Sequence, residues 1–100
     1  MEFVTRVKRV IRWKTSSDHS IASVIDYSDP SPNPEPRKLT AEDALPTGRP
    51  GVYRLVVADL NGRDLTVEVY EQTSSGDVPI HTMTSPRTVL LTYRVIPNAG

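Results

Sequence analysis

The chain has 100 residues with 12 basic and 12 acidic side chains, so its net charge favours neither a nucleic acid nor a membrane surface as its partner. Cysteine is absent, which excludes disulfides, thiolate nucleophiles and zinc sites built on cysteine. The apolar residues are mainly Val, Ile and Leu, with many Thr beside them, a composition typical of strands.

Residues 1–100 are expected to form a single domain, since a chain of this length buries one core. No stretch approaches the roughly 20 apolar residues that cross a membrane, so a membrane is not expected as a partner. The N-terminus carries charges where a signal peptide has an apolar run. This feature and the missing cysteine favour a cytoplasmic or virion location.

Residues 2–14 fit either a strand or a helix. In a strand, Phe3, Ile11 and Trp13 lie on one face, whereas in a helix Trp13 falls outside the apolar stripe. The segment is rich in β-branched residues and contains no Ala, Leu or Gln, which favours the strand. We therefore expect a strand that forms a first hairpin with a second strand at residues 21–27, and the helix is the alternative.

Residues 28–38 interrupt the strands with a proline at every second position. Each proline lacks a backbone donor and restricts the residue before it, so a proline-rich, extended and solvated loop is expected here. Such a loop either connects two sheets or binds a partner that recognises proline. In the second interpretation, the partner-binding residues are Pro30, Pro32, Pro34 and Pro36.

Residues 52–70, VYRLVVADLNGRDLTVEVY, predict a β-hairpin with a loop at Leu60-Asn61-Gly62. Gly62 supplies the left-handed conformation that this loop needs, and Asp59 and Arg63 close it with opposite charges. One side of the ribbon is wholly apolar, which indicates an antiparallel sheet with one buried face. The expected pairs are Val57 with Leu65, Leu55 with Val67, and Tyr53 with Val69.

The remaining segments complete the predicted fold. Residues 40–45 indicate one helical turn, Pro79 makes residues 78–84 either an edge strand or a strand with a late start, and residues 88–96 are apolar enough on both faces for a central strand. The fold class is therefore all-β: a small antiparallel sandwich or partly open barrel of about six strands with one short helical turn. If residues 2–14 are helical, the fold becomes α+β, with that helix on an antiparallel sheet.

Catalytic and metal-binding patterns do not stand out in the sequence. Two histidines, His19 and His81, are too few for most acid–base or metal sites, and no G-x-S-x-G elbow occurs. The glycines form no phosphate-binding loop, and the carboxylates are spread too thinly for calcium. We therefore expect no enzyme, no catalytic residues, no cofactor and no metal. A hydrolase centred on either histidine is a third and weaker hypothesis.

Basic residues concentrate near the N-terminus, and on one strand several of them would project from the same face. Such a row could follow a phosphate backbone, and a tryptophan beside it could stack on a base. The opposite interpretation is a solvated edge strand whose charges prevent aggregation. The candidate polyanion-binding residues are Arg6, Lys8, Arg12, Trp13 and Lys14.

The sequence thus predicts a non-enzymatic module that binds another protein or assembles with itself, as a subunit of a larger assembly such as a virion. The proline-rich loop and the basic N-terminal strand are the predicted contact surfaces. Binding of nucleic acid or another polyanion through that basic strand is the alternative function.

Overall fold

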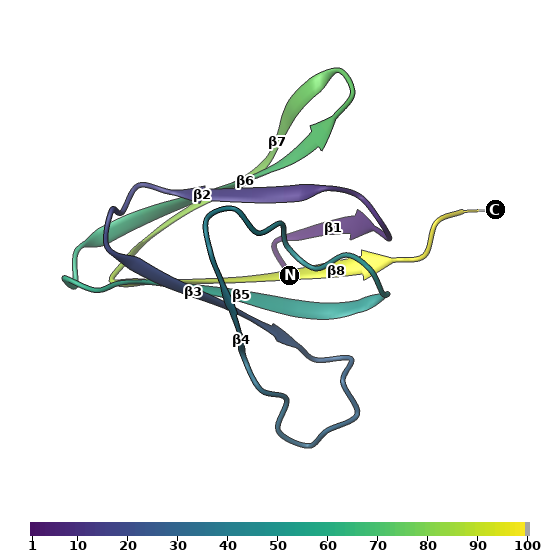
Figure 1. Ribbon diagram of the computed structural model, residues 1–100, viewed down its shortest axis with the longest axis horizontal. Coiled ribbons are helices and arrows are strands. Elements are labelled where there is room, and N and C mark those ends of the chain that lie inside the picture. Colours follow the sequence, from purple (N-terminus) through teal and green to yellow (C-terminus); the bar gives the residue numbers. More distant parts are fainter. Residues whose placement is uncertain (100) are drawn as a thin grey trace.

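The computed structural model describes residues 1–99 as two packed β-sheets (Figure 1). Five strands form the larger sheet in the order β1-β8-β5-β3-β4, and three form the smaller sheet in the order β2-β6-β7. The predicted all-β sandwich is confirmed, with eight strands where about six were expected. No helix long and apolar enough to cross a membrane occurs among residues 1–99. The strands are β1 (Phe3–Arg6), β2 (Ile11–Thr15), β3 (Ser20–Asp26), β4 (Arg37–Leu39), β5 (Gly51–Asp59), β6 (Asp64–Thr73), β7 (Gly76–Pro86) and β8 (Thr88–Ile96).

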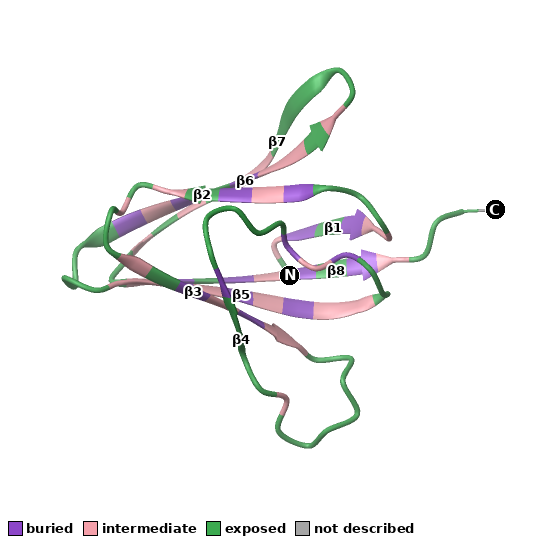
Figure 2. Cartoon of the chain, in the orientation of Figure 1, coloured by how far each residue is buried: buried purple, intermediate pink, exposed green. Residues whose placement is uncertain are grey.

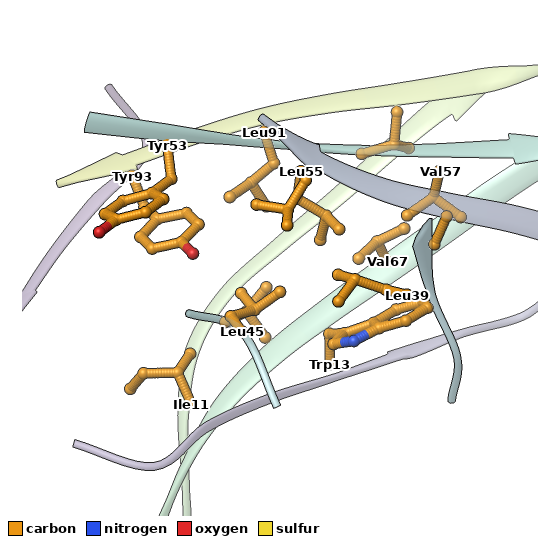
Figure 3. Packing of buried hydrophobic residues seen from close by; sticks show 14 of the residues in the cluster. Ile11, Trp13, Leu39, Leu45, Tyr53, Leu55, Val57, Val67, Leu91 and Tyr93 are labelled. Carbon is orange, nitrogen blue, oxygen red and sulfur yellow. The ribbon is translucent and has the colours of Figure 1, made fainter. Parts of the chain in front are cut away.

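The core fills the space between the two sheets, because the strands contribute alternate apolar residues to it (Figure 2). Leu55 of the larger sheet and Val67 of the smaller sheet have no exposed surface, and Figure 3 shows side chains from both sheets meeting in this layer. At one end, the ring of Tyr93 stacks on the rings of Phe3 and Tyr53, with centroids 5.1 and 5.2 Å apart. Burial of each such side chain stabilises the fold by roughly 1.5–3 kcal/mol.

The predicted central hairpin at residues 52–70 is wrong in its pairing. β5 pairs with β3 and β8, whereas β6 pairs with β2 and β7, so the chain crosses from one sheet to the other between them. The apolar side chains that were expected to be neighbours on one ribbon instead face the core from opposite sheets. Each of the two strands turns an apolar face towards the core, and the opposite sheet covers that face.

The loop between β5 and β6 nevertheless has the expected conformation. Gly62 has a φ of 68°, and its N–H donates to the carbonyl of Asp59 over 3.1 Å. The Asp59 carboxylate accepts hydrogen bonds from the N–H groups of Asn61 and Arg63, at 3.0 and 2.8 Å. The hydroxyl of Ser17 and these N–H groups hold the pKa of Asp59 below its ordinary value. The side chain therefore fixes the crossing as an anion.

The predicted strand at residues 2–14 is divided into β1 and β2, which lie in different sheets. β1 pairs in parallel with β8, and β2 pairs in an antiparallel fashion with β6, so the first hairpin with residues 21–27 does not form. The chain changes sheet between β1 and β2 at Lys8, which has a φ of 68°. It changes sheet again between β7 and β8 at Arg87, which has a φ of 62°. The helical alternative for residues 2–14 is wrong as well.

Residues 40–50 close one open side of the sandwich, and they contain no helix. The predicted helical turn is a single hydrogen-bonded turn, in which the Asp43 N–H donates to the carbonyl of Thr40 over 3.0 Å. Further along, buried Leu45 donates its N–H to the carbonyl of Ile11 over 2.8 Å. The hydroxyl of Tyr93 donates to the carbonyl of Pro46 over 2.9 Å. These contacts tie the segment to both sheets, so it takes the place of an additional strand.

Two strand positions agree with the sequence prediction. β8 lies between β1 and β5 inside the larger sheet, and β7 is an edge strand of the smaller sheet. The register of β7 shifts opposite Val69 and Tyr70, next to Pro79. An irregular edge strand with a proline resists pairing with another chain.

The left-handed backbone conformation of Lys8 leads to a prediction about stability. A left-handed conformation strains any residue with a Cβ, so Lys8→Gly should raise the free energy of unfolding by about 0.5–1 kcal/mol relative to Lys8→Ala. Both variants remove the same exposed side chain, so the comparison isolates the backbone. Urea denaturation followed by circular dichroism measures the difference. A glycine variant less stable than the alanine variant would contradict the assigned conformation.

Candidate interaction surface

The outer face of the larger sheet, meaning the side chains that point away from the core, is unusually apolar. Leu90, Val56 and Ser23 lie in one row across β8, β5 and β3. Their strands place further Val, Ile and Ala side chains on the same side, because β5 and β8 have apolar residues at both alternate sets of positions. Ile21 and Leu90 expose 53% and 51% of their surface. The apolar residues of this face are Val4, Ile21, Ile25, Tyr27, Val52, Val56, Ala58, Leu90 and Ile96.

The outer face of the smaller sheet is polar by comparison. Lys14 forms an ion pair with Glu68 at 3.2 Å, and the hydroxyl groups of Thr66 and Thr84 lie 2.8 Å apart. An antiparallel sheet with one solvated face normally carries such a polar pattern. The apolar outer face of the larger sheet departs from that pattern, and it is therefore the candidate contact surface.

A shallow groove of about 390 Å³ lies on the outer face of the larger sheet. Ile21, Val56 and Ala58 form its apolar floor, and Pro36 and Lys38 lie on the β4 side. The groove therefore extends from the middle of this face to the beginning of β4, where the proline-rich loop ends.

The charged residues of the outer face are mainly basic. Among the described residues, the outer face carries four cations, which come from β1, β4, β5 and β8. Glu2 is the carboxylate beside them. Glu2 accepts a hydrogen bond from the N–H of Thr92 over 2.6 Å. Near the centre, the Arg54 guanidinium lies 5.7 Å from the ring centroid of Tyr27, and its Nε donates to the hydroxyl of Thr92 over 3.3 Å. The four cations are Arg6, Lys38, Arg54 and Arg94.

The proline-rich loop projects from the larger sheet beyond β3 and β4, and nearly all of it is exposed (Figures 1 and 2). Pro30, Pro32 and Pro36 are exposed, whereas Pro34 is partly buried. The predicted loop at residues 28–38 ends two residues earlier than expected. Residues 37 and 38 belong to β4, so the irregular part ends at Pro36. Figure 1 shows this loop as the long excursion below β4.

The base of the loop is held by Asp26. Its carboxylate accepts hydrogen bonds from the N–H of Ser28 at 2.9 Å and from Nη2 of Arg49 at 3.1 Å. Partial burial raises the pKa of Asp26, but the hydrogen bonds from Ser28 and Arg49 outweigh burial and leave the pKa below its ordinary value. A polar cleft of about 730 Å³ lies between this base, the loop and Tyr53. Among residues 1–99, no group of three His, Cys, Asp or Glu side chains could hold a metal ion.

The five residues of the predicted polyanion site do not form one row. Lys8 interrupts the strand, so Arg6 lies on the larger sheet and Arg12 and Lys14 lie on the smaller sheet. The Nη1 of Arg6 donates to the carbonyl of Pro97 over 3.0 Å, and the Nη1 of Arg12 donates to the carbonyl of Glu42 over 2.6 Å.

The tryptophan of that predicted site faces the core. Trp13 exposes 6% of its surface, and its Nε1 donates to the carbonyl of Asp43 over 3.1 Å. It is therefore not available to stack on a base in this fold. The two histidines have separate surroundings. His19 is in the exposed turn before β3, where its carbonyl accepts a hydrogen bond from the N–H of Leu60. His81 is on β7, where it pairs with Val69 of β6.

The outer face of the larger sheet is not among the contact surfaces that the sequence predicts. A signal for it is present, since Leu90 and Ile96 lie on the second face of residues 88–96, but the same pattern is typical of a strand in the centre of a sheet. Val56 and Ala58 carry the same signal on β5. The second face became recognisable only when the sheet order placed these strands side by side without a covering layer.

Comparison with known proteins gave no match: no family model matches the chain, and no curated protein or solved structure is significantly similar to it.

Asp26 makes the loop base sensitive to acid. Because its pKa is lower in the folded state than the ordinary value of 3.8, the carboxylate stabilises the fold above about pH 4 and this contribution is lost as the pH falls through the folded-state pKa. Asp26→Asn should therefore lower the free energy of unfolding at neutral pH and flatten its decrease below about pH 4.

Denaturation in urea at a series of pH values measures this effect. Asp77→Asn, at an exposed position in β7, is the matched control and should retain the acid dependence of the wild-type protein. An Asp26→Asn variant with an unchanged acid dependence would show that the carboxylate does not anchor the loop.

Proposed function

We propose that the protein is a non-enzymatic interaction module that acts as a subunit of a larger assembly. Its contact surface consists of the outer face of the larger sheet and the proline-rich loop. The apolar outer face is the observation that carries this proposal, since a sheet face with half-exposed Ile21 and Leu90 lowers its free energy when another surface covers it. The loop adds a second, pre-extended element beside that face.

The cations on the outer face add specificity to this surface. Arg54 lies among apolar side chains and is already oriented by Tyr27 and Thr92, so little conformational entropy is lost when a partner covers it. Arginine and tyrosine are residue types that interfaces favour. An apolar face with a central arginine is therefore better suited to a protein surface than to a phosphate backbone.

Photo-crosslinking from within the cells that produce the protein tests the proposal. A photoreactive amino acid at position 90 should form covalent adducts with protein, because Leu90 lies in the contact surface. The same amino acid at position 84 is the matched control, since Thr84 is an exposed residue on the outer face of the smaller sheet. Equal labelling from both positions, or none from position 90, would contradict the proposed contact surface.

The polyanion alternative is tested separately with a labelled single-stranded oligonucleotide. Since the basic N-terminal residues are divided between two sheets, we expect no change in fluorescence anisotropy at 0.15 M salt and at most weak binding at low salt. Tight binding that weakens steeply with salt, and that Arg12→Ala with Lys14→Ala abolishes, would support the alternative function instead.

A further inference from the structure

The proposed contact surface leaves its partner open, and the distribution of charge on the molecule identifies one. Resting on the proposed function, we propose that the outer face of the larger sheet receives the proline-rich loop, residues 28–36, of a second copy of this chain. Each copy offers both elements, so two copies exchange loops and form a reciprocal dimer.

The outer face requires a partner with carboxylates. Arg54 is near its centre, and covering a cation with an apolar surface that brings no acid would leave an unpaired buried charge. Two outer faces placed directly against each other would bring like charges together. Glu2 offsets only one of the four cations on each face, so an excess of positive charge would remain. The partner surface is therefore acidic as well as apolar.

The proline-rich loop has this composition. Residues 28–36 read SDPSPNPEP, and Asp29 and Glu35 are their charged residues. The prolines provide apolar rings and carry no N–H group that burial would leave without a partner. A proline-rich segment is already extended, so its ordering on a surface costs less entropy than that of an ordinary loop. Among the described residues, the loop is exposed over nearly its whole length.

The position of the loop makes the two contacts adjacent. Pro36 ends the loop and also lies at the margin of the groove on the outer face. Loop and face therefore adjoin at the β4 side of the larger sheet, and Figure 1 shows the rest of the loop extending away from the sandwich. When a two-fold axis relates two copies, the loop of each copy lies on the outer face of the other. These two contacts adjoin and form one continuous interface.

Two charge-reversal variants test this arrangement. The face variant carries Arg54→Glu, and the loop variant carries Asp29→Lys and Glu35→Lys. Sedimentation velocity of the purified full chain, from micromolar to millimolar protein, should show a wild-type dimer at the higher concentrations. Each variant alone should dimerise at least about tenfold more weakly. An equimolar mixture should recover the dimer, since each reversed surface then meets its complement.

Controls separate the loss of the contact from the loss of the fold. Circular dichroism and thermal unfolding establish that each variant is folded, and Arg94→Glu, at a more exposed position of the same face, replaces Arg54→Glu if that variant unfolds. Asp77→Lys reverses an exposed charge in β7, outside the outer face, and should leave the dimer unchanged. Dimerisation should weaken between about 0.05 and 0.5 M salt because the contact is partly ionic.

A wild-type protein that is monomeric throughout, or a mixture that fails to recover the dimer, overturns this inference. If photo-crosslinking from position 90 then still captures another protein, the proposed function stands and its partner is a different chain. If neither a dimer nor adducts from position 90 form, both the partner and the contact surface are wrong.

Discussion

The structure depends on the chain crossing from one sheet to the other between β5 and β6. The Asp59 carboxylate holds that crossing through the N–H groups of Asn61 and Arg63, and the Asp59 N–H donates to the carbonyl of Arg87 over 2.8 Å. The end of β5, the start of β6 and the corner between β7 and β8 therefore meet at one place. Because β5 and β6 then lie in opposite sheets, their apolar faces enclose the core together.

The same crossing explains the candidate contact surface. If β6 were a neighbour of β5 in one sheet, either β3 or β8 would lose its place beside β5, and the row of Leu90, Val56 and Ser23 would be broken. The observed sheet order gathers the apolar outward residues of three strands on one face. Ile21, Leu90 and their neighbours are thus exposed as a consequence of how the core is closed, and their composition makes this face suitable for contact.

The sequence predicts most strands of this fold but not their partners. The alternation of Tyr53, Leu55 and Val57 is a local property, and it identifies β5 and its buried side correctly. A hairpin and a crossing between sheets both need the same loop, with Gly62 in a left-handed conformation. The choice between them depends on which distant strand covers the apolar face, and a local pattern contains no information on that.

The candidate site, like the fold, was predictable from the sequence only in part. The proline-rich loop was predictable because four prolines restrict their own backbone wherever the chain leads. The basic row was not, because Lys8 adopts a left-handed conformation for which nothing in its own side chain gives a signal. The outer face needed the sheet order before Leu90 and Val56 could be placed beside each other.

The pairing of β5 is therefore the most direct test of this account. Backbone proton contacts in a two-dimensional nuclear Overhauser spectrum of the isotope-labelled protein report which strands are neighbours. The structure predicts backbone contacts of Leu55 with Leu91 on β8 and with Val24 on β3. Backbone contacts of Leu55 with Val67 on β6 would instead establish a hairpin, and they would contradict both the sandwich and the contact surface derived from it.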